Sequence, residues 1–390
     1  MKQKLFKRIC NVLSLMTIGL MLLSCNNNDI DGVVLPYIGG TNLEGFIYGP
    51  QEITLDESKA YTISGNLIIG DEAVLIIPKG MKIKAAKGAD KYILVLKGGQ
   101  IRILGTKDEP VTIAPEENSE EPGYWGGIII NGKAPIAGLN ASGLNERITE
   151  INHTYMFGGN KENDSSGRIS YLILKYPGAK FSETEEHNGL TLNAVGRGTT
   201  IDHLFVLGSA DDAVECFGGT VDVTNLLAVD ADDDMFDFTE GYKGTFSDCY
   251  GCWQASFNPN EADPSGLEVD GNLDGLSPEA IDQTTFVMKN LTLDIRCTKE
   301  IANLINLRRG ATVTLSNTFV KLSEQAKLTK LVNLTDEQGD VKSLTSDISY
   351  TLFDPAQLVD KSSLQGAEEV TIQNSKGIGE DAFSWTGFAF

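Results

Sequence analysis

The sequence predicts an all-β protein built as a parallel β-helix, a solenoid of short strands with capping segments at both ends. The first observation is an internal repeat, because residues 201–219 align with residues 223–241 at a shift of 22 positions. Repeated strand-rich units of this length are typical of solenoids. The second is the apolar–polar–apolar alternation inside each copy, which indicates strands with one buried face. The third is the content of 41 glycines against 12 prolines in 390 residues, which favours many tight turns.

Residues 1–24 have the pattern of a secretory signal peptide. A basic start precedes an apolar run that is too short and wrongly flanked for a lasting transmembrane helix. The run ends in Leu22-Leu23-Ser24-Cys25, which resembles the lipobox of bacterial lipoproteins. The resemblance implies cleavage before Cys25, acylation of that residue and a flexible tether over residues 25–45. The alternative is an ordinary signal peptide followed by a chance cysteine.

The β-helix is expected to span residues 46–322. Its first part, up to Pro115, indicates two coils of three strands, each about 26 residues long. Six lysines between Lys79 and Lys97 form either a solvated face or a patch that docks an acidic partner or the acidic middle of this chain. Residues 136–166, rich in Gly, Asn, Ser and Glu, are expected to leave the stack as a long loop.

Four short strands in the middle of the chain carry a row of acidic residues. Because strands of adjacent coils lie about 4.7–4.9 Å apart, equivalent residues form columns. Glu215, Asp237 and Glu268 are expected to point outward in one file, and two aspartate pairs stack in the turn just before it. The two inward columns on either side of the file are Val214, Phe236 and Leu267, and Cys216, Phe238 and Val269.

The stacked carboxylates are candidate ligands of a divalent cation, with calcium as the first candidate. Like charges about 5 Å apart repel by roughly 1 kcal/mol per pair in bulk water, and by a few kcal/mol at an effective dielectric constant near 20. A bound cation would offset this repulsion, and oxygen ligands clustered in turns suit calcium. The alternative is that the acids project into solvent and increase solubility. The candidate metal ligands are Asp211, Asp212, Glu215, Asp233, Asp234, Asp237 and Glu268.

The repeat period breaks after Gly251. Residues 253–264 are expected to form a loop that overhangs the acidic row. Residues 286–322 continue the coils, and residues 323–390 are expected to hold the last coils and a C-terminal cap, because a solenoid must cover its open ends. The aromatic end of the chain, residues 383–390, is expected to pack onto the last coil.

Several segments together resemble a family of Bacteroidetes surface lipoproteins with a right-handed parallel β-helix of the pectin-lyase-like type. The resemblance covers roughly residues 50–275 and implies a fold and a location, with no established reaction. It rests on the segments WGGIIINGKAP (125–135), IPKG (77–80), NGLTL (188–192), GTTIDH (198–203), DDAVECFGG (211–219) and DDDMFDFTEGYKG (232–244).

Charge and cysteine spacing exclude several other classes of protein. A net charge of −22 argues against nucleic acid and anionic membrane surfaces as partners. Cys249 and Cys252 have CxxC spacing, but no second pair supports a zinc site and no βαβ pattern supports a redox site. We therefore expect a local disulfide or two reduced core residues at these positions.

These observations predict a lipid-anchored outer-membrane protein, at the cell surface or facing the periplasm, that binds a glycan or an outer-membrane protein, with calcium at the acidic row. One alternative is a calcium-dependent polysaccharide lyase or glycoside hydrolase, since paired carboxylates can act as acid and base. His203, Lys243 and Arg197 would be its candidate helpers, although the chain has no GxSxG or HExxH motif and no catalytic residue is assigned. Another alternative is a structural surface or adhesion component.

Overall fold

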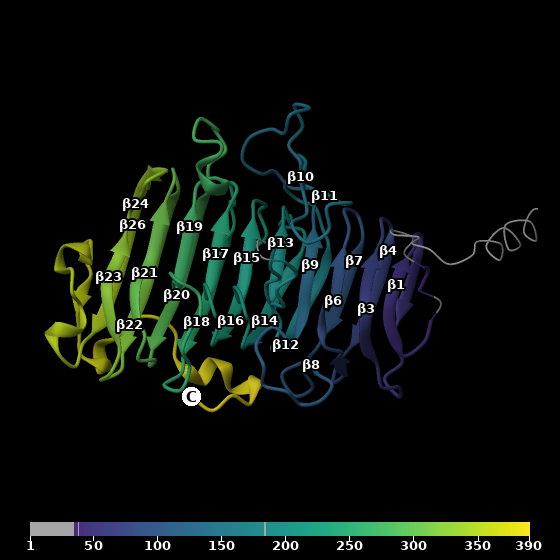
Figure 1. Ribbon diagram of the computed structural model, residues 1–390, viewed down its shortest axis with the longest axis horizontal. Helices are drawn as coiled ribbons and strands as arrows, with labels where there is room; N and C mark the ends of the chain where they lie inside the picture. The colour runs from purple at the N-terminus through teal and green to yellow at the C-terminus, as the bar shows by residue number, and fades with distance from the viewer. Residues whose placement is uncertain (1–34, 38, 183–184) are drawn as a thin grey trace, which may run out of the picture. The chain divides into compact units, whose positions relative to one another are not determined.

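The computed structural model describes residues 35–37, 39–182 and 185–390, and these residues form strands stacked coil upon coil (Figure 1). The predicted signal peptide, Cys25 and most of the predicted tether lie outside the described residues. The ladders between successive coils are parallel, so the expected all-β parallel β-helix is confirmed. In the part of the chain that is described, no helix has the length and hydrophobicity needed to span a bilayer.

One side of the solenoid, here called the pocket face, is a continuous parallel ladder. Each of its strands pairs with the equivalent strand of the next coil, which aligns every side chain with its counterpart about 4.8 Å away. Its strands are β1 (Asn42–Ile47), β3 (Thr62–Ile69), β6 (Gly88–Val95), β9 (Trp125–Asn131), β13 (Leu190–Asn193), β15 (Val214–Phe217), β17 (Phe236–Thr239), β19 (Leu267–Asp270), β21 (Glu300–Arg308) and β23 (Lys327–Asn333).

Most of the remaining strands form the second ladder, here called the bent face. In the early coils it consists of separate short strands, which confirms the two predicted three-strand coils. From β12 onward each coil has one bent strand, because β12 pairs with β7 through its first half and with β8 through its second. The strands are β2 (Gln51–Thr54), β4 (Ala73–Pro78), β5 (Lys82–Ala85), β7 (Gln100–Leu104), β8 (Val111–Pro115), β12 (Gly167–Lys175), β14 (Thr200–Leu207), β16 (Val223–Val229), β18 (Thr245–Trp253), β20 (Thr285–Ile295), β22 (Thr312–Leu322) and β26 (Ser343–Thr351).

The bend in these strands comes from one residue per coil with a left-handed backbone. Asn, Asp and His tolerate this conformation better than other residues with a Cβ atom, and most of the positions carry one of them. The register stacks these residues above one another, so they form one corner of the solenoid. The residues, with φ between 50° and 58°, are Tyr171, His203, Asn225, Asp248, Asn290 and Asn317.

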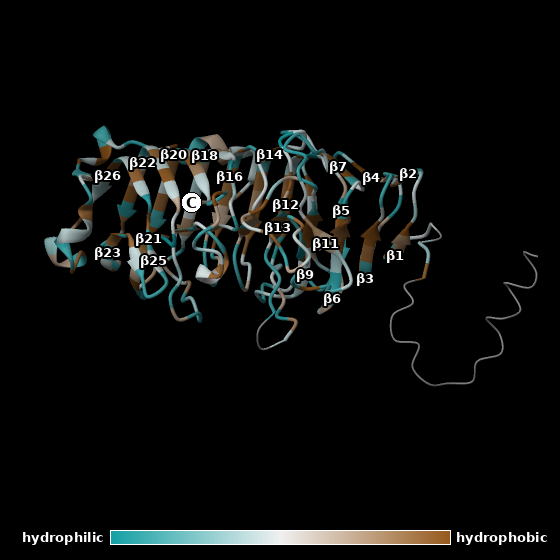
Figure 2. Ribbon diagram, turned by 90° about the horizontal axis from the view of Figure 1, so that it is seen from above, coloured by the Kyte–Doolittle hydropathy of each residue, from teal (hydrophilic) through white to brown (hydrophobic). Residues whose placement is uncertain are grey.

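The interior is filled by the inward side chains of both faces. All six residues of the predicted inward columns are buried, with at most 1% of each residue exposed, so these columns are confirmed. Phe238 stacks on Phe286 across the interior at a ring separation of 4.0 Å. Each fully buried side chain of this size contributes about 1.5–3 kcal/mol of hydrophobic free energy. Figure 2 shows the corresponding pattern, with hydrophobic segments along the strands and hydrophilic residues in the loops.

Two long segments leave the carboxyl ends of pocket-face strands. Residues 132–166 follow β9 and carry the hairpin of β10 (Arg147–Ile148) and β11 (Met156–Phe157), which rises above the strands in Figure 1. This confirms the predicted long loop. Residues 271–284 follow β19, contain the short helix η1 (Leu273–Gly275) and meet the first segment where Ser277 lies beside Gly138.

The last coil is followed by short elements that cover its end. Leu358, between two 3-10 helices, is buried against the core, and Gln357 donates hydrogen bonds to the carbonyl groups of Ser323 and Ala326 at 2.6 and 2.9 Å. The elements that follow β26 are η2 (Pro355–Gln357), η3 (Lys361–Leu364), β27 (Glu368–Glu369), η4 (Ile372–Asn374) and η5 (Glu380–Thr386). A small hairpin of β24 (Thr335–Asp336) and β25 (Gly339–Asp340) lies between β23 and β26.

The aromatic C-terminus does not pack onto the last coil, so that prediction was wrong. Residues 377–390, including η5, run back along the bent face as far as β12, and Phe383 and Trp385 are buried there. The physical reason is an outward apolar column of residues in register on four successive strands, which water would otherwise contact. The column consists of Ile173, Phe205, Leu227 and Tyr250.

The lysines of the early coils do not form a free basic patch. Lys79 pairs with Glu109, Lys87 pairs with Glu121, and Lys97 pairs with Glu146 of the long segment. Acidic residues of neighbouring coils therefore neutralise much of this charge. The interpretation of the lysines as a solvated face fits better than a docking surface.

Candidate metal centre in an acidic pocket

Three acidic side chains form a file along the outside of the pocket face. Glu215 in β15 pairs in register with Asp237 in β17, and Asp237 pairs with Glu268 in β19. The expected file is therefore confirmed. Its neighbours in the same register are uncharged, with Thr191 before it and Asn306 after it. The negative charge is confined to three successive coils.

The turn before the file contains a second column, in which side chains link one coil to the next. Asp212 accepts a hydrogen bond from the backbone N–H of Asp234 at 2.8 Å, and Asp234 accepts one from the N–H of Ser265 at 2.6 Å. Asn188 accepts a hydrogen bond from the backbone N–H of Asp212 at 3.2 Å. One oxygen of each aspartate therefore holds the turn in place. The other oxygen of each remains available as a ligand.

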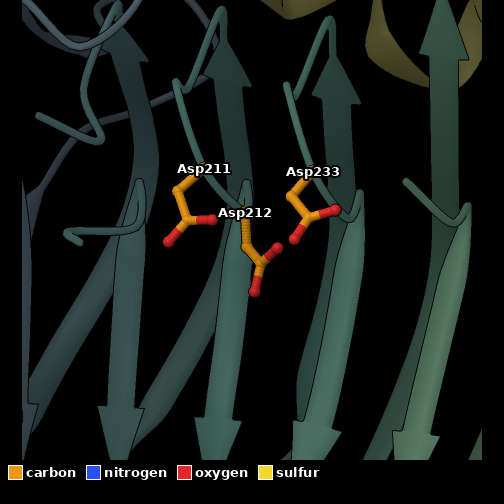
Figure 3. Close-up of side chains that lie close together, drawn as sticks. All are labelled: Asp211, Asp212 and Asp233. Atoms are coloured by element: carbon orange, nitrogen blue, oxygen red, sulfur yellow. The ribbon is translucent and has the colours of Figure 1, made fainter. Parts of the chain in front are cut away.

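The carboxylates of the turn and of the file come together. Figure 3 shows Asp211, Asp212 and Asp233 with their carboxylate groups directed toward one another from adjacent turns. Ligand oxygens of these three residues all lie within 4.8 Å of one another, and two further groups of three meet the same limit. All seven predicted ligands belong to these triads, which are Asp211/Asp212/Asp233, Asp212/Glu215/Asp237 and Asp234/Asp237/Glu268.

The triads lie in a pocket of about 560 Å³. Its floor is the pocket face, and its walls come from segments distant in the sequence. The segment after β9 supplies Ile148 and Phe157, and the loop before β19 supplies Glu261 and Asp263. This loop was predicted to overhang the acidic row, and its two acids line the pocket there. The described lining residues are Arg147, Ile148, Glu150, Phe157, Glu186, Asn193, Asp211, Asp212, Glu215, Phe217, Asp233, Asp234, Asp237, Glu240, Glu261, Asp263, Glu268 and Leu273.

The wall residues could not be recognised from the sequence. Glu150 and Glu186 belong to segments without the repeat, so no register places them beside the acidic row. Arg147 is the one basic residue in the described lining, and it lies 3.3 Å from Glu240, which it contacts through Nε. Arg147 also donates a hydrogen bond to the carbonyl oxygen of Ala137 at 2.9 Å. Its charge is therefore directed at the wall of the pocket.

Burial shifts the protonation of the whole cluster. Burial, followed by the charge of Asp270, raises the pKa of Asp237 to about 7. Burial and the nearby acids Asp263 and Glu261 raise the pKa of Asp233 to the same value. Burial raises the pKa of Glu215 well above its ordinary value, and the neighbouring charge of Asp237 adds to this. The pKa values of the other triad residues, Asp211, Asp212, Asp234 and Glu268, are raised well above their ordinary values for the same first reason.

Asp237 also has an unsatisfied oxygen. Its Oδ1 atom is buried and has no hydrogen-bond partner among the described residues. A buried acceptor without a partner costs roughly 1–3 kcal/mol, and more when it is charged. Asp237 belongs to two of the three triads. A proton or a bound cation would satisfy it.

In the described chain, direct ion pairs reach the row only at its far end. Arg308 of β21 contacts Glu268 through a nitrogen of its guanidinium group and Asp270 through Nε at 3.0 Å. Arg309 contacts Asp270 at 2.6 Å and Asp336 at 2.7 Å. Within the described residues, none of the other six triad acids forms an ion pair. The row is therefore neutralised at Glu268 and left without basic partners before it.

The residues considered for a lyase or hydrolase do not lie in this pocket. His203 is in the corner column of the bent face, where its ring stacks on Tyr171 at 3.9 Å beneath Trp385. Lys243 pairs with Asp282 at 2.7 Å. The side chain of Arg197 is not part of the described lining. The hypothesis that these residues assist the acids is therefore wrong.

The cysteines of the described chain are buried and reduced. Cys216, Cys249, Cys252 and Cys297 form no disulfide, which settles the open alternative at the CxxC pair in favour of reduced core residues. Burial raises the pKa values of all four thiols, so none of them is a reactive thiolate near neutral pH.

Comparison with known proteins identifies the fold family. A search of curated proteins finds no match, and a search of solved structures also finds none. The narrower relation to Bacteroidetes surface lipoproteins remains a prediction. The family model of the pectate-lyase-like β-helix domain matches residues 46–387, which include the pocket face, the acidic row and most of the C-terminal segment. The chain belongs to this family of pectate-lyase-like β-helix domains.

Proposed function

We propose that this chain is a binding protein of the bacterial envelope that holds calcium in its acidic pocket and, through the calcium, a glycan rich in hydroxyl groups. The observation that carries the proposal is the row of six triad carboxylates that have no basic partner in the described chain. Burying a charged carboxylate without a counter-charge costs several kcal/mol. A bound cation offsets that cost, and sites made only of oxygen ligands favour calcium over softer metals.

The charge of the pocket favours a neutral glycan over an acidic one. Twelve of the described lining residues are Asp or Glu, and Arg147 is their only basic counterpart in that lining. Bound calcium would offset only part of this negative charge, so the pocket would still repel a polyanion. The hydroxyl groups of a neutral sugar can complete the coordination of calcium without adding charge. The volume of about 560 Å³ falls within the range of roughly 300–1,000 Å³ typical of small-molecule sites.

The lipid anchor belongs to the same proposal. Attachment at Cys25 would hold the protein at the outer membrane, on the cell surface or on the periplasmic side, within reach of glycans or of an outer-membrane partner protein. Metabolic labelling with a radioactive fatty acid tests this directly. Label on the wild-type chain and none on Cys25→Ser is expected, whereas equal labelling of both would contradict the anchor.

Calcium binding is tested by titration calorimetry and thermal melting of chelator-treated protein. Saturating calcium is expected to raise the unfolding midpoint, because a ligand that binds only the folded state stabilises it. The double variant Asp212→Asn/Asp237→Asn is expected to lose most of this rise, whereas Asp108→Asn, an exposed acid outside the pocket, is expected to keep it. An unchanged wild-type midpoint would rule out calcium. A glycan array read with calcium and with chelator then tests the glycan.

One observation favours a catalytic alternative, a polysaccharide lyase or glycoside hydrolase. Carboxyl groups with pKa values raised to about 7, as at Asp233 and Asp237, suit a general acid. Incubation with neutral and acidic polysaccharides, followed by assays for unsaturated and reducing ends, decides between the two. Product that disappears in Asp237→Asn would favour catalysis, and absence of product across the panel would favour binding.

A further inference from the structure

The third triad differs from the other two because a guanidinium group already occupies its side of the row. Arg308 contacts Glu268 and Asp270, and its side chain is only 12% exposed. Asn306 donates a second hydrogen bond to Glu268 at 2.8 Å, so both oxygens of this carboxylate are engaged. A pocket of about 270 Å³ at this end of the row is lined by Arg308 together with Glu215, Asp237 and Glu268. The guanidinium group of Arg308 therefore already offsets the negative charge that a cation bound to this triad would offset.

The charge of Arg308 also reaches the centre of the row. It lowers the pKa of Asp237, opposing the increase caused by burial and by Asp270. It lowers the pKa of Glu268 in the same way. Asp237 is shared between the second and third triads. A divalent cation in the third triad would have to approach this guanidinium group, and like charges a few ångströms apart repel strongly in a site of low dielectric constant.

We infer that Arg308 is the built-in counter-cation of the third triad and that the row therefore binds two calcium ions, not three. This inference rests on the proposed calcium binding. Three triads are present, and one of them already holds a positive group, which leaves Asp211/Asp212/Asp233 and Asp212/Glu215/Asp237. These two share Asp212, and cations bridged by one carboxylate commonly lie about 3.5–4 Å apart. The buried Oδ1 of Asp237 has no hydrogen-bond partner among the described residues, and no basic side chain forms an ion pair with Asp237 there, so a ligand between the acids of the row would satisfy it.

The arrangement makes Arg308 a residue that determines how many cations the pocket takes. Replacing its side chain with an uncharged one of similar length would leave Asp234, Asp237 and Glu268 as an open oxygen triad. A third calcium ion is then expected to bind. Lysine at the same position keeps the positive charge and is expected to keep the stoichiometry of the wild-type protein. The charge of residue 308, and not its shape, is the variable under test.

The experiment measures calcium bound per molecule by equilibrium dialysis and elemental analysis of the purified full-length chain at pH 8. Two ions are expected for the wild-type chain and for Arg308→Lys, and three for Arg308→Met. The double variant Arg308→Met/Glu268→Gln is expected to return to two, because the third triad loses a charged ligand. Arg296→Met, which removes an arginine from a buried aspartate elsewhere, is the matched control and is expected to bind two.

Folding of each variant is verified by circular dichroism in calcium, so that a misfolded chain is not mistaken for a negative result. A folded Arg308→Met chain that binds two ions or fewer would overturn the inference, and so would a wild-type chain that binds one ion or three. A wild-type chain that binds no calcium would instead overturn the proposed function. The two failures are therefore distinguishable from the same data.

Discussion

Two buried acidic sites in this protein are neutralised in opposite ways. On the bent face, Oδ2 of Asp294 accepts hydrogen bonds from Tyr250 at 2.8 Å, from Arg296 at 2.9 Å and from Lys321 at 3.0 Å. On the pocket face, Asp212 and Asp234 are also buried, yet the side chains around Asp212 add negative charge instead of positive. The ladder explains both cases. The residue in register with Asp294 on the next coil is Lys321, whereas those in register with Asp237 are Glu215 and Glu268.

The two sites depend differently on their surroundings. A carboxylate neutralised by basic side chains of its own chain, as at Asp294, needs no external cation to offset its charge. A row of carboxylates without internal partners is stable only with protons or an external cation, so its state depends on the surroundings. The same protein uses both solutions a few coils apart. The absence of basic partners at the pocket is therefore a feature of that site and not of the fold.

The largest loss of stability is expected from removing the C-terminal segment, which covers the apolar column of the bent face. This segment also supplies Glu380 to the site of Asp294, Arg296 and Lys321, here called the paired site. Ending the chain at Lys376 removes Phe383 and Trp385, and buried aromatic side chains of this kind contribute about 3–5 kcal/mol each. We expect a loss of stability on the order of 5 kcal/mol or more in urea unfolding.

A chemical probe locates the effect. Cys252 lies beneath this segment, whereas Cys249 faces the interior of the coil. In the shortened chain a maleimide is expected to label Cys252 and to leave Cys249 unlabelled. Protection of both cysteines with an unchanged urea midpoint would show that the segment contributes nothing to the paired site or to its cover.

The next largest effect is expected from breaking the paired site itself. Arg296→Met leaves Asp294 with less counter-charge in a fully buried position, and removal of one partner of a buried pair typically costs about 3–5 kcal/mol. The loss is expected to be the same with and without calcium. Arg168→Met, which breaks an exposed pair with Asp202, is the control and is expected to cost less than about 1 kcal/mol. Equal losses in the two variants would remove the basis of the comparison.

The comparison also indicates how far the sequence could predict this protein. The acidic file followed from the repeat, because a shift of 22 residues places Asp237 on Glu215. The walls of the pocket did not follow from the repeat, since residues 132–166 have no periodicity and their position depends on tertiary contacts. Arg308 was missed for a different reason. It lies beyond the repeat, where a single arginine at the end of a strand carries no signal until the ladder places it beside Asp270. The returning C-terminal segment likewise depends on an apolar column visible only after folding.

The two sites should also differ in their response to pH. The pKa values of Asp233, Asp237 and Glu150 are raised from 3.8 or 4.5 to about 7 in the folded protein. The folded state therefore binds more protons than the unfolded state between these values, and stability is lost as the pH rises through about 7. Burial lowers the pKa of His187 to about 4, so this residue makes the folded protein more stable as the pH rises. The three carboxyl groups outweigh this single histidine.

Thermal melting of the calcium-free protein between pH 4.5 and pH 8 measures this response. The midpoint is expected to fall across the range, and saturating calcium is expected to flatten the fall, since the cation replaces the protons. Arg296→Met is expected to lower the unfolding midpoint by the same amount at every pH, because the site around Asp294 does not cause the dependence on pH. A midpoint that rises toward pH 8 without calcium would contradict the assignment of protons to the pocket.

The smallest effect concerns one carboxylate at the centre of the row. Asp237→Asn removes a negative charge between Glu215 and Glu268 and replaces an acceptor that has no partner with an amide that can donate. Relief of like-charge repulsion is expected to stabilise the calcium-free protein by on the order of 1 kcal/mol, whereas a substitution at a paired site destabilises. In saturating calcium the gain is expected to disappear, because the same substitution removes a ligand. Thermal melting of each variant without calcium and in saturating calcium measures the direction of the stability change in both states. Asp108→Asn is the exposed control. If Asp237→Asn destabilised the calcium-free chain, the carboxylate would be structural, and the contrast between the two faces would no longer hold.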